Sequence, residues 1–156
     1  MASTGSTSFH KAAEASPIPT DAPLLLYDGT CGFCARSVQF VLRHEGRRRT
    51  LRFARLEGAT GLALRARHPE LEGVDSLVWV EPSASIHEER VWVRSRGVRA
   101  VARYLGGIWR ALAALGALVP ARALDAAYDW IARHRHQIAA PACLLPSPEE
   151  RRRFID

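Results

Sequence analysis

The chain of 156 residues is poor in cysteine and lysine, and it has no long apolar run. Three cysteines are too few for a framework of structural disulfides, and thiols in a reducing compartment stay reduced unless a catalytic cycle oxidises them. A run of about 18 consecutive apolar residues, which a membrane-spanning helix needs, does not occur. The N-terminal residues also lack the apolar segment of a secretory signal. These absences predict a soluble, cytoplasmic protein without a membrane partner, in which the cysteines serve redox chemistry or bind a metal.

Lys11 is the only lysine, so arginine supplies almost all of the net charge of +6. The arginines are spread over residues 47–49, 94–103 and 151–153, which is typical of a solvated surface. Such runs can also bind phosphates or an acidic partner. No nucleic-acid-binding motif is interleaved with them, so we do not expect nucleic-acid binding. A non-catalytic interaction module with a basic surface for an acidic partner remains an alternative function.

The length fits one domain, and 47% hydrophobic with 24% charged residues is typical of a globular protein. Residues 1–23 are the exception. They are rich in Ser, Thr, Ala and Pro and have no apolar period, so they cannot bury enough surface to offset the entropy of ordering. We therefore predict a flexible leader over 1–23 and a domain over 24–156.

The most informative segment is an apolar run followed by two closely spaced cysteines. The residues from Leu24 to Tyr27 are continuously apolar, as in a central strand that is covered on both faces. Thr30 is the expected N-cap of a helix that continues at helical spacing to about His44 and ends at Gly46. The cysteines, Cys31 and Cys34, therefore lie at the first turn of a helix that follows a buried strand.

The remaining pattern alternates strands and helices. Strands are expected at 51–55, 76–80 and 90–93, the last two forming an antiparallel hairpin, and helices at 60–67 and from a Ser95 cap to Leu105. This βαβαββα order, with the thiol pair after the first strand, is that of an α/β, thioredoxin-like fold of glutaredoxin size. We place this core at about 24–106. A helical extension at about 107–156 follows, with an apolar segment at 108–119 and an amphipathic one at 120–137.

Several blocks together resemble the DCC family. They are Tyr27–Cys34, Asp75–Val78, Ser95, Trp130–Arg135, Cys143 and Pro146. The family is named after an Asp, a Cys and a second Cys, which here are Asp28, Cys31 and Cys34. The resemblance extends from about residue 24 to the C-terminus. It implies a thioredoxin-like, predicted thiol-disulfide oxidoreductase, and it says little about the substrate.

The chemistry of the pair can be derived from its position. Thiolate is the attacking species in disulfide exchange, and unpaired N–H groups at a helix start favour a sulfur anion, which makes Cys31 the expected nucleophile. Cys34 lies one turn further in and should be more shielded, so it would resolve the mixed disulfide. Asp28 is a candidate acceptor for the proton of Cys34, and equally a candidate for a turn or capping residue.

A metal site is the second interpretation of the thiol pair. Cys31 and Cys34 would supply half of a zinc site, completed by Cys143 with His134 or His136, but the chain lacks a second closely spaced cysteine pair. We therefore favour redox chemistry and expect no metal and no cofactor. Cys143, in an apolar loop, is more typical of a small buried hydrophobe.

Three residues are candidates for substrate contact. Phe33 lies between the cysteines. Asp75 and Ser76 stand where thioredoxins usually carry a cis-proline beside the thiols, so substrate binding should differ from that in thioredoxin. The expected partners are a thiol or disulfide substrate, either a protein or a small molecule, and an unidentified reductant.

Overall fold

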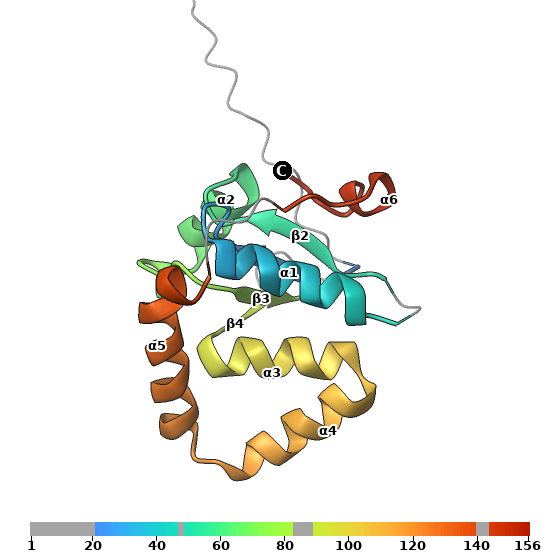
Figure 1. Ribbon diagram of the computed structural model, residues 1–156. Coiled ribbons are helices and arrows are strands. Elements are labelled where there is room, and N and C mark those ends of the chain that lie inside the picture. The colour runs from blue at the N-terminus through green and yellow to red at the C-terminus, as the bar shows by residue number, and fades with distance from the viewer. Residues whose placement is uncertain (1–20, 47–48, 83–88, 140–143) are drawn as a thin grey trace, which may run out of the picture.

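The computed structural model describes residues 21–46, 49–82, 89–139 and 144–156 (Figure 1). These residues contain a four-stranded sheet of order β2-β1-β3-β4. Its strands are β1 (Leu24–Tyr27), β2 (Arg52–Arg55), β3 (Val78–Glu81) and β4 (Arg90–Val93). β1 pairs parallel with β2 and antiparallel with β3, which pairs antiparallel with β4. This mixed sheet confirms the predicted thioredoxin-like architecture.

Helices cover both faces of the sheet. On one face lie α1 (Gly32–His44) and α3 (Arg94–Leu105), whose apolar residues pack with Leu25 and Tyr27 of β1. On the other face α2 (Ala59–Arg67), followed by the 3-10 helix η1 (Pro69–Leu71), packs with Leu24 and Leu26. All four residues of β1 are buried, because successive side chains alternate between two covered faces. The end of β1, where the cysteines follow, is therefore held from both sides.

The helical extension is present and has two arms. α4 (Gly107–Leu115) turns away from α3 at Gly106 and Gly107, whose φ angles of 69° and 52° suit glycine, and it continues into the 3-10 helix η2 (Gly116–Leu118). α5 (Ala121–Ile138) then runs back to contact α1 and α3 (Figure 1). This path brings α5 to the N-terminal end of α1. The apolar face of α4 is poorly covered, with Ile108 69% exposed.

No single helix in the described part of the chain is long and apolar enough to cross a membrane. Two segments joined by a sharp bend, Gly107–Leu118 and Ala121–Arg135, are together long and apolar enough for a membrane span, judged by length and composition alone.

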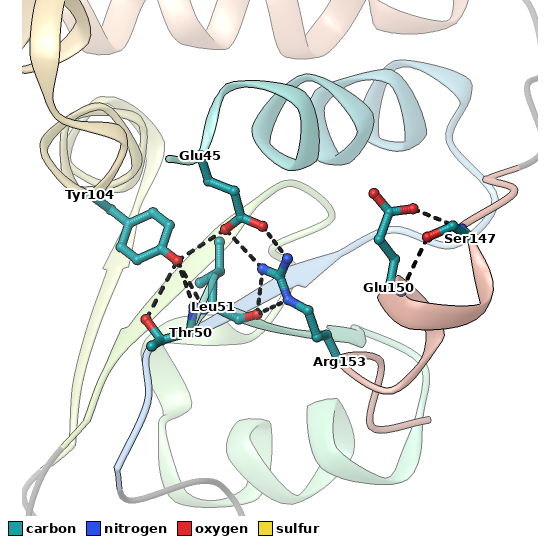
Figure 2. Close-up of polar contacts among 7 residues, drawn as sticks. All are labelled: Glu45, Thr50, Leu51, Tyr104, Ser147, Glu150 and Arg153. Carbon is teal, nitrogen blue, oxygen red and sulfur yellow. Dashed lines mark hydrogen bonds and ion pairs between the residues drawn. The ribbon is translucent and has the colours of Figure 1, made fainter. Parts of the chain in front are cut away.

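The C-terminal residues return to the sheet, which the sequence did not predict. After the short helix α6 (Pro148–Arg151), which begins with a capping box between Ser147 and Glu150, the chain runs along the free edge of β2 (Figure 2). The N–H of Phe53 donates to the carbonyl of Arg153 at 2.9 Å, and the N–H of Ile155 donates to the carbonyl of Phe53 at 2.9 Å. The C-terminus therefore covers an edge that would otherwise present unpaired backbone groups.

A buried polar cluster fastens this C-terminal segment (Figure 2). Arg153 forms an ion pair with Glu45, whose side chain is 1% exposed, and donates from Nε to the carbonyl of Leu51 at 2.9 Å. Tyr104 of α3 donates to the same carboxylate at 3.0 Å and accepts from the N–H of Leu51 at 3.0 Å. The cluster thus joins the end of α1, the start of β2, α3 and the C-terminus.

Two expected details away from the thiol pair were wrong. Ser95 does not cap α3: Val93 is the N-cap residue, and the hydroxyl of Ser95 donates instead to Asp125 on α5. The third strand begins at Val78 rather than at Ser76, because Asp75 and Ser76 contact α5 through Arg135 and Tyr128. In both places a contact with the helical extension replaces the expected cap or strand residue.

The predicted leader, residues 1–23, lies largely outside the described residues. Within its described part, Ala22 is buried.

Candidate redox site

Asp28 shapes the turn between β1 and α1. Its Oδ1 accepts hydrogen bonds from the N–H of Thr30 at 2.8 Å, the hydroxyl of Thr30 at 2.7 Å and the N–H of Cys31 at 3.1 Å. Asp28 is therefore a turn residue, which is one of the two functions that the sequence left open for it. Thr30 is not the N-cap of α1, because its hydroxyl donates to Asp28 and the helix starts one residue later.

Cys31 is the N-cap residue of α1. Its Sγ accepts a hydrogen bond from the N–H of Cys34 at 3.5 Å, in the position where Ser or Asp oxygens usually cap helices. Negative charge on this sulfur faces free N–H groups and the positive end of the helix dipole. The two cysteines are buried to a similar extent, with Cys31 1% and Cys34 2% exposed, so the exposed fractions do not show which thiol is the more shielded. Both sulfurs are free and buried.

Burial changes the titration of the Cys34 thiol. Burial raises the pKa of the Cys34 thiol to about 12, assisted by the charge of Cys31 and by its hydrogen bond to Cys31. Cys34 therefore keeps its proton at neutral pH and can donate it toward Cys31. An arrangement of one capped sulfur and one protonated, buried neighbour is suited to nucleophilic attack by Cys31.

Arg135 of α5 is a site residue that sequence reasoning missed. Its Nη2 lies 2.6 Å from Oδ2 of Asp75 and 3.7 Å from Oδ2 of Asp28, and its Nη1 donates to the carbonyl of Asp75 at 2.6 Å. Burial lowers the pKa of Arg135, but Asp75 and the charges of Cys31 and Cys34 raise it above its ordinary value. A buried guanidinium therefore lies within electrostatic reach of both sulfurs. In the sequence, Arg135 belongs to the block Trp130–Arg135, which is part of the family resemblance and by itself carries no signal of a contact with the thiols.

A cavity of about 570 Å³ opens beside the thiol pair. Cys34 forms part of its wall, together with residues of β1, α1, α3, α4 and α5. The proposed contact residues Phe33 and Ser76 also line it. Tyr128, another lining residue, hydrogen-bonds with Ser76, and burial raises its pKa. The sequence could not have shown this cavity, because its walls come from segments far apart in the chain.

Asp75 lies beside the cavity rather than in its wall. Its carboxylate is 71% exposed and is held by Arg135. The structure thus brings together Asp28, Cys31, Cys34 and, through Arg135, Asp75. Phe33 and Ser76 join them from the cavity side.

No cluster of three or more His, Cys, Asp or Glu side chains suited to a metal ion is found among the residues that the structure describes. Cys143 and the side chain of His136, both part of the zinc alternative, lie outside those residues.

A thioredoxin-like sheet with two thiols at the start of its first helix defines a redox class of protein. Comparison with protein families specifies which one. The model of the DCC1-like thiol-disulfide oxidoreductases matches residues 25–140, so the chain belongs to this family, as the sequence resemblance indicated. Membership supports a redox function and leaves the reaction itself open.

Two relatives extend the comparison. The chain is 31% identical over 135 residues to the uncharacterized protein YuxK of Bacillus subtilis (strain 168), with 85% of this chain and 93% of the relative covered. It is 29% identical over 115 residues to a DCC family protein of Arabidopsis thaliana described as chloroplastic, with 73% of this chain and 63% of the relative covered. No solved structure is significantly similar to the chain.

Proposed function

We propose that the protein is a thiol-disulfide oxidoreductase that works through Cys31 and Cys34. The observation that carries the proposal is the position of Cys31 as the N-cap of α1, with its sulfur hydrogen-bonded to the N–H of Cys34. This position stabilises a sulfur anion, while burial keeps Cys34 protonated until it is needed. Family membership supports the same redox class.

The reaction follows from this asymmetry. The thiolate of Cys31 attacks one sulfur of a substrate disulfide, forming a mixed disulfide and releasing the first substrate thiolate. Cys34 then loses its proton and attacks Sγ of Cys31, which forms the Cys31–Cys34 disulfide and releases the second thiolate. The substrate gains two electrons and two protons, and the protein dithiol is oxidised. A thiol reductant returns the pair to the dithiol by the reverse steps.

Asp28 is our candidate for the proton acceptor in the second step. Its Oδ2 is not used by the turn hydrogen bonds, which go to Oδ1, and it faces Arg135. The backbone of Asp28 lowers the pKa of Cys34 through a hydrogen bond to the thiol, and the charge of Asp28 makes a smaller contribution that raises it, so Asp28 adjoins the thiol. Asp28 therefore holds the turn with one oxygen and is available to the thiol through the other.

The test is a thiol count with matched variants. Mild oxidation of the purified protein should reduce the three titratable thiols to one, and near-stoichiometric zinc should be absent from the protein as isolated. Cys31→Ser should abolish exchange, Cys34→Ser should accumulate mixed disulfides, and Cys143→Ser should behave as the wild type. A chain that keeps three free thiols under oxidation, or that unfolds when a chelator removes a bound metal, would rule the proposal out.

A further inference from the structure

The cavity beside Cys34 has the size of a small-molecule site. Pockets for small ligands usually have volumes of about 300–1,000 Å³, and the volume here is about 570 Å³. Its walls are mostly apolar side chains, among them Phe40, Leu105 and Trp109. A ligand that fills it must therefore have a largely apolar body.

Three polar side chains of the lining, Ser76, Tyr128 and Arg135, form a connected group near the sulfur of Cys34. Tyr128 hydrogen-bonds with Ser76, and the charges of Cys34 and Arg135 both influence its titration. Arg135 in turn lies within reach of both sulfurs. The cavity thus has an apolar body and a polar region beside Cys34, the resolving thiol, whereas the nucleophile Cys31 adjoins Cys34 in the turn and is not itself part of the wall.

An unpartnered donor also lines the cavity. Trp79 is 5% exposed, and its indole N–H is buried without a hydrogen-bond partner in the part of the chain that the structure describes. Buried polar groups are nearly always hydrogen-bonded, because an unpaired donor costs free energy. The nitrogen itself is not open to the cavity, so a carbonyl or another acceptor on a ligand would reach this N–H only with a small shift of the indole ring.

A polypeptide does not suit these walls. An extended peptide carries an N–H and a carbonyl at almost every residue, and apolar walls would leave most of them unpaired. A polyanion such as glutathione disulfide is less suited, because of the two guanidinium groups in the lining Arg135 is already paired with Asp75 and Asp28 and Arg36 is exposed to solvent. A small, neutral molecule fits the lining best.

We propose that this cavity binds a neutral, largely apolar small-molecule disulfide, or the corresponding dithiol, as the substrate of the Cys31–Cys34 pair. The inference rests on the proposed thiol-disulfide exchange and specifies its substrate class. When the ligand is the dithiol, it is oxidised to its disulfide, and the Cys31–Cys34 disulfide takes up the two electrons and two protons and becomes the dithiol. In the other direction the same bonds form and break in reverse.

Dihydrolipoamide and dihydrolipoate are the probes, since both carry the same dithiol and differ in one terminal group, a neutral amide or a carboxylate. The oxidised protein is mixed with each, and the reduction rate is measured against concentration. Rates with a simple unhindered disulfide correct for intrinsic reactivity. We expect half-saturation by dihydrolipoamide at a concentration at least tenfold lower than by dihydrolipoate. Equal half-saturation, or faster reduction by a protein dithiol, would overturn the inference.

A filled cavity provides the matched control. Ala102 of α3 lines the cavity, whereas Ala111 of α4 is exposed and does not. Ala102→Phe should remove the preference for dihydrolipoamide, and Ala111→Phe should retain it. Thermal unfolding of both variants shows whether they are folded. If Ala102→Phe is folded and keeps the preference, the cavity is not the site.

Binding can be measured without chemistry. In a variant with both Cys31→Ser and Cys34→Ser, lipoamide should change the tryptophan fluorescence saturably, because Trp79 and Trp109 line the cavity, and lipoate should do so only at much higher concentration. The absence of a saturable change would contradict the inference, whatever the exchange assays show. Exchange without preference for a neutral probe would overturn the inference and leave the proposed function standing. Failure of the Cys31–Cys34 disulfide to form would instead overturn the proposed function.

Discussion

Nη2 of Arg135 lies 3.7 Å from Oδ2 of Asp28, and both side chains are more than nine-tenths buried. The two residues come from α5 and from the turn after β1, so the helical extension supplies a charge to the thiol site of the core. A buried carboxylate without a cation is costly, and a buried guanidinium near two sulfurs favours negative charge on them. The extension is therefore part of the site.

Replacing the guanidinium should change the reactivity of the thiol pair. With Arg135→Gln we expect reaction with a small neutral alkylating reagent to slow about tenfold at neutral pH, as a loss of about 1.4 kcal/mol of anion stabilisation would produce. The pH–rate profile should move to higher pH, because the thiolate loses a nearby positive charge. Arg135→Lys, which keeps the charge, should restore part of the rate.

A purely structural role for Arg135 makes a different prediction. In that case Arg135→Gln would lower the midpoint of urea unfolding, while the folded fraction would react with an unchanged pH–rate profile. Measuring both quantities on the same variants separates the two roles.

The two oxygens of Asp28 can be tested separately. Asp28→Asn keeps an acceptor for the three turn hydrogen bonds, so its free energy of unfolding should stay close to that of the wild type, whereas Asp28→Ala should lose about 1–2 kcal/mol. If Asp28 accepts the proton of Cys34, both variants should slow the resolution of a preformed mixed disulfide about a hundredfold. If Asp28→Asn resolves the mixed disulfide at the wild-type rate, Asp28 does not accept the proton and only stabilises the turn.

The high pKa of Cys34 predicts how stability depends on pH. Burial, the largest cause, raises this pKa from 9.0 to about 12, so the unfolded chain loses the proton at lower pH than the folded one. The neutral thiol therefore stabilises the fold fully below pH 9, and this contribution should be lost between about pH 9 and pH 12. The slope should reach at most about 1.4 kcal/mol per pH unit.

Urea unfolding of the wild type and of Cys34→Ala across this range is the measurement. Both proteins carry Tyr128→Phe, because the charge of Cys34 helps to raise the pKa of Tyr128. Tyr27, whose pKa burial also raises, contributes equally to both, so the difference between them reports Cys34. Parallel pH curves for the two proteins would contradict the assignment. Thiolate absorbance of Cys31→Ser should independently show a midpoint above 9.0, because burial remains after the neighbouring charge is removed.

Local patterns in the sequence predicted the core of the fold well. The run from Leu24 to Tyr27 is apolar because both faces of β1 are covered, and the helix after it ends at His44 as its spacing indicated. The caps were less predictable. Ser95 and Thr30 are typical cap residues, but each has a better partner, Asp125 or Asp28, and only the folded chain brings Asp125 within reach of Ser95.

The site was predicted only as far as its residues are neighbours in the chain. Cys31, Cys34 and Asp28 share one turn, so their proximity follows from the motif. Arg135 reaches them through the path of α5, and the cavity arises where α5 returns to α1 and α3, with Trp109 of α4 completing its wall. The sequence pattern predicts neither the position of Arg135 nor the cavity, because both depend on the directions in which the helices run relative to the sheet.

The C-terminal ion pair offers a test of the fold away from the site. Arg153→Met leaves the carboxylate of Glu45 buried without its cation, which should cost about 3–5 kcal/mol of unfolding free energy. Arg152→Met is the matched control, because the neighbouring side chain is exposed and should change stability by less than about 0.5 kcal/mol. Urea unfolding followed by tryptophan fluorescence measures both.

A double variant distinguishes a buried charge from lost packing. If the cost of Arg153→Met comes from the unpaired carboxylate, adding Glu45→Gln should recover much of it, because a neutral amide costs less to bury and can still accept from Tyr104. If the cost comes instead from detachment of the C-terminal residues from β2, the second substitution should recover nothing, and the amide of Phe53 should exchange its hydrogen as fast in the double variant as in Arg153→Met. Hydrogen exchange at Phe53 therefore shows whether Arg153 stabilises the protein through its charge or by holding the C-terminus against the sheet edge.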